Sequence, residues 1–411
     1  MKKQHLILLA GLVTMMISCN KNTPASSESI PELDSLVAQL QSAKPHILGY
    51  PVNQRSELHD FYEWYHSTGL DTLNLNNAGN PFDEEGYAMS TRQFERDVLE
   101  YFAPYYGFDV NNLWGLVTNS GTDGNNHGIY FGANVLYRQT GRNPIVYVSN
   151  EAHYSNMRIC DLQNLELRLI KTDSMGRMLP EDLEQQLDPT RGCLIVYAMG
   201  STFKGAVDDI ETLNSVLDKY PQMPVYRHLD AALFGGYLPF TQYKEMVNCQ
   251  QLNVQSISIS GHKFFGIDSP CGLFLTSKDV YDGQDSFDIP YLNSNMRMIS
   301  CSRDAIQPLK FWWLIRRVGA DKWSEQAAQM LKSTQYLKQE LTKIGWPCWC
   351  NEYSNTVFFR RPSQALVQKY CLACGYDELF GGNLSHIVVM QHVSPEAIDR
   401  FIADLQKEIN Q

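Results

Sequence analysis

The stretch that decides the fold is Val254-Gln255-Ser256-Ile257-Ser258-Ile259-Ser260-Gly261-His262-Lys263. Residues 254–259 alternate between the two sides of an extended chain, which predicts a β-strand. A hydroxyl, a glycine and a histidine then bring Lys263 to the end of that strand. A lysine placed in this way can form a Schiff base with an aldehyde cofactor, beside groups that hold a phosphate. Taken alone, a lysine at a strand end is more often a solvated charge.

A second candidate lies upstream, in Arg227-His228-Leu229-Asp230-Ala231-Ala232. The apolar residues 224–226 before it predict a buried strand, so Asp230 would lie at the carboxyl edge of the sheet, where open α/β sheets bind ligands. A buried carboxylate needs a partner, and a protonated pyridine nitrogen is one. The alternative for a lone aspartate is the N-cap of a helix.

Two further segments also follow predicted strands. Residues 145–148 lead to Glu151-Ala152-His153-Tyr154-Ser155, in which His153 could stack on an aromatic ring or bond to loop backbone. Residues 117–125 (Val-Thr-Asn-Ser-Gly-Thr-Asp-Gly-Asn) open a helical pattern. Such a turn can hold a phosphate, because free N–H groups and the positive end of the helix dipole face the anion. It matches neither a P-loop nor a dinucleotide fingerprint, and alone it could be an ordinary N-cap.

The order of these elements resembles the pyridoxal-phosphate (PLP) enzymes of fold type I, and more narrowly the group II amino-acid decarboxylases of the histidine and plant serine decarboxylase type. The resemblance is collinear from about Ile47 to the C-terminus. The resembling stretches are Gly49-Tyr50-Pro51, residues 94–102, 114–119, 200–209, 230–240 and 258–263, and Pro270-Cys271-Gly272.

The resemblance implies a role for each candidate. Lys263 would form the Schiff base with PLP, Asp230 would pair with the ring nitrogen, and His153 would stack on the ring. The remaining cofactor contacts would come from Ser120, Gly121, Thr122, Thr202, Ser260 and His262. Tyr291, the usual candidate in the family, or Lys263 would return a proton to the substrate after carbon dioxide leaves. The resemblance also implies a homodimer in which segment 285–303 reaches the partner's site; no metal site is expected.

The chain departs from the family pattern in its substrate-facing loop. Family members carry a run like Thr-Ile-x-Gly-Ser-Arg-Asn-Gly-His where residues 298–306 read Met-Ile-Ser-Cys-Ser-Arg-Asp-Ala-Ile. Ser302 and Arg303 are kept. A new carboxylate at Asp304 near the site would repel acidic substrates, and loss of the glycine would restrict the backbone. We therefore expect weak activity on histidine and weaker activity on glutamate and aspartate.

The predicted function is decarboxylation of an L-amino acid, histidine-like or serine-like, to an amine and carbon dioxide. Two alternatives remain open at this stage. The chain could be another PLP-dependent C–C lyase, or a surface lipoprotein of PLP fold that has lost catalysis. The altered loop favours the second alternative, whereas the intact cofactor residues oppose it.

The N-terminus predicts export rather than folded structure. Lys2-Lys3 and the short apolar run 6–13 resemble a signal peptide over residues 1–18, too short to span a bilayer. Met16-Ile17-Ser18-Cys19 resembles a bacterial lipobox. We expect lipidation of Cys19, a flexible tether over residues 19–29 and attachment to the bacterial cell envelope, on the periplasmic or outer-membrane face. The alternative is a disordered terminus with a chance cysteine.

Length and composition suit a large globular domain with a smaller one. The 411 residues are 44% hydrophobic and 19% charged, and the formal charge of −11 argues against a nucleic-acid partner. We expect an N-terminal helical segment (30–105), a PLP-binding α/β large domain with a mainly parallel sheet (106–304), and a linking helix followed by a small α+β domain (305–411). Strands are expected at 145–148, 165–170, 194–199, 224–229, 256–260, 273–276, 356–360 and 387–391.

The cysteines leave three possibilities open. Ten are present, and the nine besides Cys19 include the pairs Cys348/Cys350 and Cys371/Cys374. An odd count implies at least one free thiol or an intermolecular pair. Zinc ligands, a disulfide and packed thiols are all possible for the pairs, and packed thiols are favoured because the spacing does not match paired zinc knuckles.

Overall fold

The structure is a computed structural model that describes residues 29–83, 87–290 and 294–410. The chain divides into two units, Met1–Pro45 and His46–Gln411. Helix α1 (Pro31–Ala43) of the first unit buries none of its residues. Cys19 and the expected signal peptide lie outside the described part of the chain. Within that part, no helix is both long enough and apolar enough to cross a membrane.

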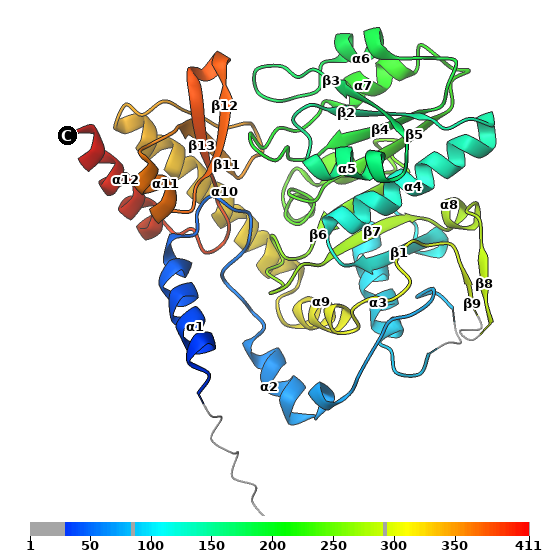
Figure 1. The fold of residues 1–411 in the computed structure, drawn as a ribbon, viewed down its shortest axis with the longest axis horizontal. Coiled ribbons are helices and arrows are strands. Elements are labelled where there is room, and N and C mark those ends of the chain that lie inside the picture. The colour runs from blue at the N-terminus through cyan, green and yellow to red at the C-terminus, as the bar shows by residue number, and fades with distance from the viewer. Residues whose placement is uncertain (1–28, 84–86, 291–293, 411) are drawn as a thin grey trace, which may run out of the picture. The chain divides into compact units, whose positions relative to one another are not determined.

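A seven-stranded sheet forms the centre of the second unit, in the order β1-β7-β6-β5-β4-β2-β3 (Figure 1). Its strands are β1 (Leu113–Thr118), β2 (Ile145–Ser149), β3 (Glu166–Ile170), β4 (Cys193–Ala198), β5 (Val225–Asp230), β6 (Ser256–Ser260) and β7 (Gly272–Ser277). Neighbours from β3 to β6 pair in parallel, whereas β7 runs antiparallel to β6 and β1. The mainly parallel sheet expected from the sequence is confirmed. β7 reverses because only residues 261–271 join it to β6, too short for a helical crossover.

Both faces of this sheet are covered by helices. In β2, Ile145 and Tyr147 belong to one apolar core, while Val146 and Val148 belong to another on the opposite face. The first core includes α3 (Arg92–Phe102), α7 (Ile210–Leu217) and α9 (Ile306–Arg317), and the second includes α4 (Gly121–Thr140) and α5 (Tyr154–Leu162). This two-sided burial explains why β2 and β4 read as continuous apolar runs in the sequence. The remaining helices of this region are α2 (His59–Ser67), α6 (Pro180–Gln186) and α8 (Lys278–Asp282).

Helix α4 lies unusually close to the sheet because glycines occupy the face that meets it. A Cβ at Gly124 would come 2.2 Å from Ser258 Oγ, and a Cβ at Gly128 would come 2.3 Å from the His228 ring. Gly121 and Gly132 make equally close approaches along the same face of the helix. This packing presses the first turn of α4 against the carboxyl ends of β5 and β6.

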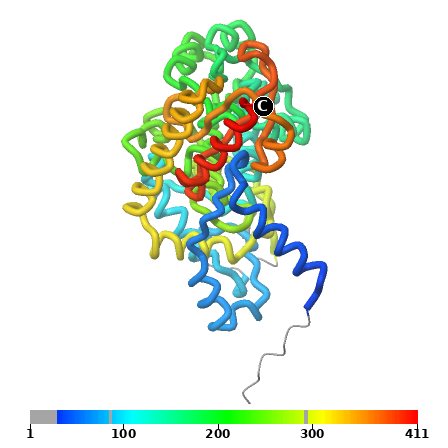
Figure 2. Tube along the Cα trace, turned by 90° about the vertical axis from the view of Figure 1, so that its left-hand side faces the viewer, coloured from blue at the N-terminus to red at the C-terminus, as the bar shows by residue number. Residues whose placement is uncertain are grey.

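A smaller sheet of four antiparallel strands, in the order β10-β11-β13-β12, forms the C-terminal part. Its elements are α10 (Gly319–Lys343), β10 (Cys348–Trp349), β11 (Thr356–Arg360), α11 (Gln364–Lys369), β12 (Ala373–Asp377), β13 (Gly382–Val388) and α12 (Pro395–Ile409). Figure 2 shows α12, in red, running alongside α10. The expected small α+β domain with its own sheet is confirmed, and so is the strand at 356–360.

The sequence prediction fails for one hairpin of the small domain. The strand expected at 387–391 lies earlier, as β13, and β12 was not expected. β12 reads Ala-Cys-Gly-Tyr-Asp, mostly residues that disfavour strands, so its pairing with β13 comes from context. Cys374 therefore lies on a strand. All nine described cysteines are free, so no disulfide joins the described pairs, and Cys301 and Cys374 are exposed rather than packed.

The segment expected to form a mobile loop contains a small two-stranded sheet. Its strands are β8 (Phe287–Ile289) and β9 (Ser294–Met296). Tyr291, the expected proton donor, lies between them and outside the described residues. The helix expected at 305–318 is present as α9.

Candidate active site

A cavity of about 480 Å³ opens at the carboxyl ends of the parallel strands. Its lining includes every cofactor-binding candidate of the sequence analysis: Ser120, Gly121, Thr122, His153, Thr202, Asp230, Ser260, His262 and Lys263. The small domain contributes Ala373, Cys374 and His386, and the N-terminal part of this unit contributes Gly49, Tyr50 and Pro51. The structure therefore gathers all candidates except Tyr291 around one space.

Asp230 ends β5 with only 8% of its surface exposed. Its Oδ2 accepts hydrogen bonds from the Asn125 amide (2.9 Å) and the Asn156 amide (3.1 Å), and its Oδ1 accepts from the Ala232 N–H (3.2 Å). Three donors favour the ionised carboxylate, which still has acceptor capacity toward the cavity. No described helix begins directly after Asp230, so it is not an N-cap.

Lys263 lies beyond the end of β6 with its amine in the same cavity. No described side chain or backbone group forms a hydrogen bond or ion pair with its Nζ. Burial lowers the pKa of Lys263 to about 8, against an opposing effect of nearby Asp230. The consequence is a larger fraction of neutral, nucleophilic amine at physiological pH than an exposed lysine would have.

His153 is held by the helix that follows it. Its Nδ1 caps α5 by accepting from the Ser155 N–H (3.3 Å) and lies 2.7 Å from Ser155 Oγ. Burial lowers the pKa of His153, nearby Asp230 opposes this shift, and nearby Lys263 adds to it. The neutral ring is therefore both bonded to loop backbone and exposed to the cavity, so the two interpretations of His153 are compatible.

The first turn of α4 supplies free donors to the cavity. Ser120 caps this 20-residue helix by accepting from the Asp123 N–H (3.2 Å). The N–H groups of Gly121 and Thr122 find no acceptor among the described residues. The helix dipole adds to their affinity for an anion. A side chain at Gly121 would fill this space, because a Cβ there would lie 2.5 Å from Ser260 Oγ.

These features together fit PLP. The α4 turn with Ser260 and His262 offers an anion site, Asp230 offers an acceptor for a ring N–H, and Lys263 offers an unpaired amine for the aldehyde. The His262 ring is fixed by the Cys271 backbone, with Nδ1 3.1 Å from the carbonyl oxygen. Thr202 lies in the turn after β4 and lines the same cavity.

Sequence reasoning missed two amides that hold Asp230. Asn125 is part of the phosphate turn that the sequence analysis quoted, and Asn156 follows His153 by three residues. Both are buried, at 2% and 0% exposure. The sequence did contain one indication: each asparagine lies on the face of a helix that is expected to be buried. A buried amide needs a hydrogen-bond partner, and a candidate carboxylate is one.

The base of segment 285–303 is fixed by a buried ion pair. Arg303 forms two parallel hydrogen bonds to Glu95, Nε to Oε1 (3.0 Å) and Nη2 to Oε2 (2.9 Å), with the two side chains 1% and 0% exposed. Asn77 and the Val117 N–H also donate to this carboxylate. Arg303 therefore anchors the loop to β1 and α3, and Asn77 supports this anchor.

The altered residues 304–306 do not line the cavity of their own chain. Asp304 accepts from the Ile306 N–H (2.6 Å) and the Gln307 N–H (3.3 Å), which caps α9. Ala305 is buried at 1% exposure. In this chain the Asp304 carboxylate stabilises a helix start, and the expectation that it selects the substrate by charge stays a prediction.

Glu95→Gln is expected to lower the free energy of unfolding by roughly 3–5 kcal/mol, because the Arg303 charge would stay buried without a carboxylate. Urea denaturation followed by fluorescence would measure the loss. Asp161→Asn, which breaks an ion pair with side chains 80% and 75% exposed, is the matched control. We expect it to change stability by less than about 1 kcal/mol. An equally small effect of Glu95→Gln would contradict the anchoring role.

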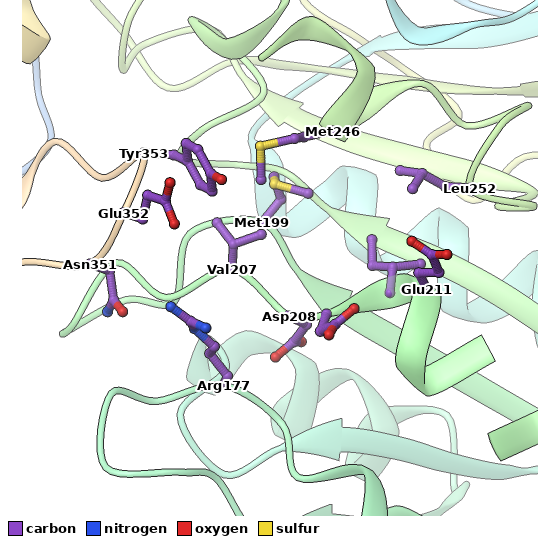
Figure 3. A pocket seen from close by; sticks show the side chains of 12 residues that line it. Arg177, Met199, Val207, Asp208, Glu211, Met246, Leu252, Asn351, Glu352 and Tyr353 are labelled. Atoms are coloured by element: carbon purple, nitrogen blue, oxygen red, sulfur yellow. The ribbon is translucent and has the colours of Figure 1, made fainter. Parts of the chain in front are cut away.

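A separate cavity of about 430 Å³ contains none of the candidates (Figure 3). It is lined by residues 199 and 207–211 of the large domain and by Asn351, Glu352 and Tyr353. Burial raises the pKa of Asp208 to about 6, although this carboxylate accepts from the Met178 and Ala198 N–H groups, both at 2.8 Å. Asp208 thus links the backbone at Met178 to the backbone at Ala198, which is a structural role.

Known proteins are similar to this chain over most of its length. The Pyridoxal-dependent decarboxylase conserved domain matches residues 137–360, more than half of the chain. Histidine decarboxylase of Solanum lycopersicum is 32% identical over 393 residues, which covers 93% of this chain and 90% of that protein. Serine decarboxylase 1 of Oryza sativa subsp. japonica is 33% identical over 368 residues, covering 88% and 72%.

A solved structure supports the fold. L-methionine decarboxylase from Streptomyces sp. 590 superposes with a TM-score of 0.77 at 21% identity, covering 92% of this chain and 94% of that one. Together with the long matches to histidine and serine decarboxylases, this places the cavity in a known architecture. The chain belongs to the pyridoxal-dependent decarboxylase family and is a PLP-dependent carboxy-lyase of fold type I.

Proposed function

We propose that this enzyme converts an L-amino acid with a histidine-like or serine-like side chain to the amine and carbon dioxide. One observation carries the proposal: a single cavity holds the unpaired Lys263 amine, the triply bonded Asp230 carboxylate and the free N–H groups of α4. The substrate class is supported by relatives named histidine and serine decarboxylases, at 32% and 33% identity.

PLP, when bound, supplies an electron-withdrawing ring that stabilises the charge left when carbon dioxide departs. The chain's own residues bind and orient it. Lys263 would take the aldehyde, the Gly121 and Thr122 N–H groups would hold the phosphate, and Asp230 would keep a proton on the ring nitrogen. His153, neutral and capped against α5, would cover one face of the ring. Tyr291 is proposed to return a proton to the α-carbon.

The remaining lining of the cavity favours an uncharged or weakly basic substrate side chain. Among the described residues of that lining, Asp230 and Lys263 are the only ones that are acidic, lysine or arginine. The aromatic residues Tyr50, Tyr154 and Phe203 also line the cavity and have no role in the proposed binding of the cofactor. The two tyrosines are 52% and 72% exposed. A second substrate carboxylate would find no cation beside Lys263, so glutamate and aspartate should bind poorly.

The test is a panel of natural amino acids mixed with the PLP-loaded protein, with carbon dioxide and amines quantified by mass spectrometry. We expect turnover of histidine, serine or a similar neutral amino acid, and at least tenfold lower kcat/KM for glutamate and aspartate. Glutamate as the best substrate would contradict the proposed class. Absence of any amine from a fully loaded protein would favour the alternative of a chain that has lost catalysis.

We further propose that the enzyme is a homodimer, as members of this family generally are, with segment 285–303 reaching the partner's site. Its support is an apolar hollow of about 480 Å³ lined by Trp64, Leu73, Phe94, Trp312 and Trp313, which the described chain leaves uncovered. Light scattering should give twice the 46.9 kDa of one chain. Trp312→Glu should shift the population toward monomer and reduce turnover. A fully active monomer would contradict this arrangement.

Lipid attachment at Cys19 is proposed from the lipobox-like Ser18-Cys19 after a short apolar run. The protein from its native host should carry acyl chains on Cys19, detected by mass spectrometry of the N-terminal peptide, and should lie in the cell envelope. The several acyl chains expected on Cys19 would give a stable anchor. Cys19→Ala would remove all of them, so the variant should leave the membrane fraction. An unmodified N-terminus would refute the proposal.

A further inference from the structure

A chain of buried hydrogen bonds leads away from Asp230 beneath the cavity. Asn125 donates to Asp230 Oδ2 (2.9 Å), and Asn125 Oδ1 lies 3.0 Å from His228 Nε2. His228 Nδ1 lies 2.8 Å from Ser256 Oγ, and this oxygen accepts from the Tyr226 hydroxyl (3.0 Å). None of the four residues behind Asp230 is more than 2% exposed. They come from α4, β5 and β6, so three elements meet in this chain.

The direction of the chain follows from its donors and acceptors. Asp230 accepts from three N–H donors, so Asn125 must present its NH₂ group to it and its oxygen to His228. His228 Nε2 must then carry a hydrogen. Burial lowers the pKa of His228 to about 4, so the ring is neutral and its Nδ1 can only accept, from Ser256. Every donor therefore points toward Asp230.

This direction excludes the reversed amide of Asn125. A flipped Asn125 would put its oxygen against Asp230 Oδ2 and its NH₂ group against the His228 Nε2–H, so both contacts would be repulsive. The His228 ring cannot retreat, because helix α4 meets it at Gly128, where even a Cβ would approach within 2.3 Å. The ring position thus determines the amide orientation.

We propose that His228 is a positioning residue for decarboxylation: through Asn125 it holds Asp230 as an ionised, correctly oriented acceptor for the cofactor ring nitrogen. The inference rests on the proposed role of Asp230. Aligned hydrogen bonds in a buried chain strengthen one another, so the effect of His228 should reach Asp230 without contact. A merely structural role for His228 would affect stability and leave cofactor affinity unchanged.

Two substitutions at one position separate these roles. His228→Phe removes both polar atoms, and we expect the apoprotein to bind PLP roughly 10- to 100-fold more weakly, with kcat reduced at least tenfold and KM within about threefold. His228→Gln can donate to Asn125 and accept from Ser256, so it should recover to within about threefold of wild type. Tyr197→Phe is the control, since it removes a buried hydroxyl that donates to Asn214 (2.8 Å) in the same sheet. It should leave PLP affinity unchanged.

A second readout needs no cofactor. ¹⁵N NMR of the histidine-labelled apoprotein, with the His228 signal identified by its loss in His228→Gln, should show a neutral ring protonated on Nε2 from pH 5.5 to 8. A ring protonated on Nδ1, or an imidazolium in that range, would overturn the inference. So would a His228→Gln variant as impaired as His228→Phe.

The role of Asp230 is tested separately. If Asp230→Asn is impaired while His228→Phe keeps wild-type PLP affinity and kcat, this inference alone is overturned. If Asp230→Asn itself behaves as wild type, the proposed function of Asp230 fails, and the inference fails with it. Impairment of both variants with recovery in His228→Gln supports the inference.

Discussion

Lys263→Ala is expected to abolish the covalent bond between protein and PLP and to reduce carbon dioxide release by at least about three orders of magnitude. Lys263 is the only lysine or arginine among the residues that line the cavity. Its amine has no described partner, so it is free to react with the aldehyde. Borohydride reduction followed by peptide mass spectrometry would locate the bond in the wild-type protein.

The matched control for this variant is Lys278→Ala, which changes an exposed lysine paired with Asp282. It should keep both the bond and the turnover. A borohydride-trapped adduct that persists in Lys263→Ala, on whatever residue, would show that another amine holds the cofactor.

The lowered pKa of Lys263 gives the same reaction a pH signature. The neutral amine is the nucleophile, so the rate at which the apoprotein bonds to PLP should rise with pH and level off above about 8. With an ordinary lysine, whose pKa is about 10.4, the rate would continue to rise up to about that pH. Stopped-flow absorbance between pH 6 and 10 would separate the two. A rate still rising steeply at pH 9.5 would mean that the cavity does not lower the pKa of Lys263.

Strand positions and the location of the site could be predicted because both depend on local sequence. β2 and β4 are buried on both faces and read as short apolar runs, whereas β6 alternates, and each described candidate residue lies at the end of a strand or a few residues after it. Since the carboxyl ends of parallel strands share one edge, strand order was not needed to bring Asp230 and Lys263 together.

The features that could not be predicted depend on contacts between distant segments. Asn125 and Asp230 are 105 residues apart, and the residues around each of them do not indicate the hydrogen bond between the two side chains. The pairing of β12 with β13 overrides weak strand propensity in the same way. Asp304 shows the opposite case, because its bond to the Ile306 N–H is a local capping contact that an aspartate just before a helix start could have indicated.

Asp230→Asn is expected to retain the fold and lose about three orders of magnitude in kcat, equivalent to roughly 4 kcal/mol in the barrier. The amides of Asn125 and Asn156 both donate to the Oδ2 position, so the new side chain must keep its oxygen there. Its NH₂ group then takes the Oδ1 position, where it loses the hydrogen bond from the Ala232 N–H and presents hydrogens to the cavity. A donor there cannot hold a proton on a ring nitrogen, so the electron-withdrawing form of the cofactor is lost.

The control for this variant is Asp208→Asn, at another buried carboxylate outside the active-site cavity. Both Asp208 contacts are backbone N–H donors, so its replacement should lower the melting temperature while leaving kcat within about threefold. For Asp230→Asn we expect a wild-type circular dichroism spectrum, a smaller loss of melting temperature because only one backbone N–H contact is broken, and a kcat reduced by about three orders of magnitude. The reasoning depends on which atom of residue 230 faces the ring, so a variant that turns over substrate within threefold of wild type would remove Asp230 from the mechanism.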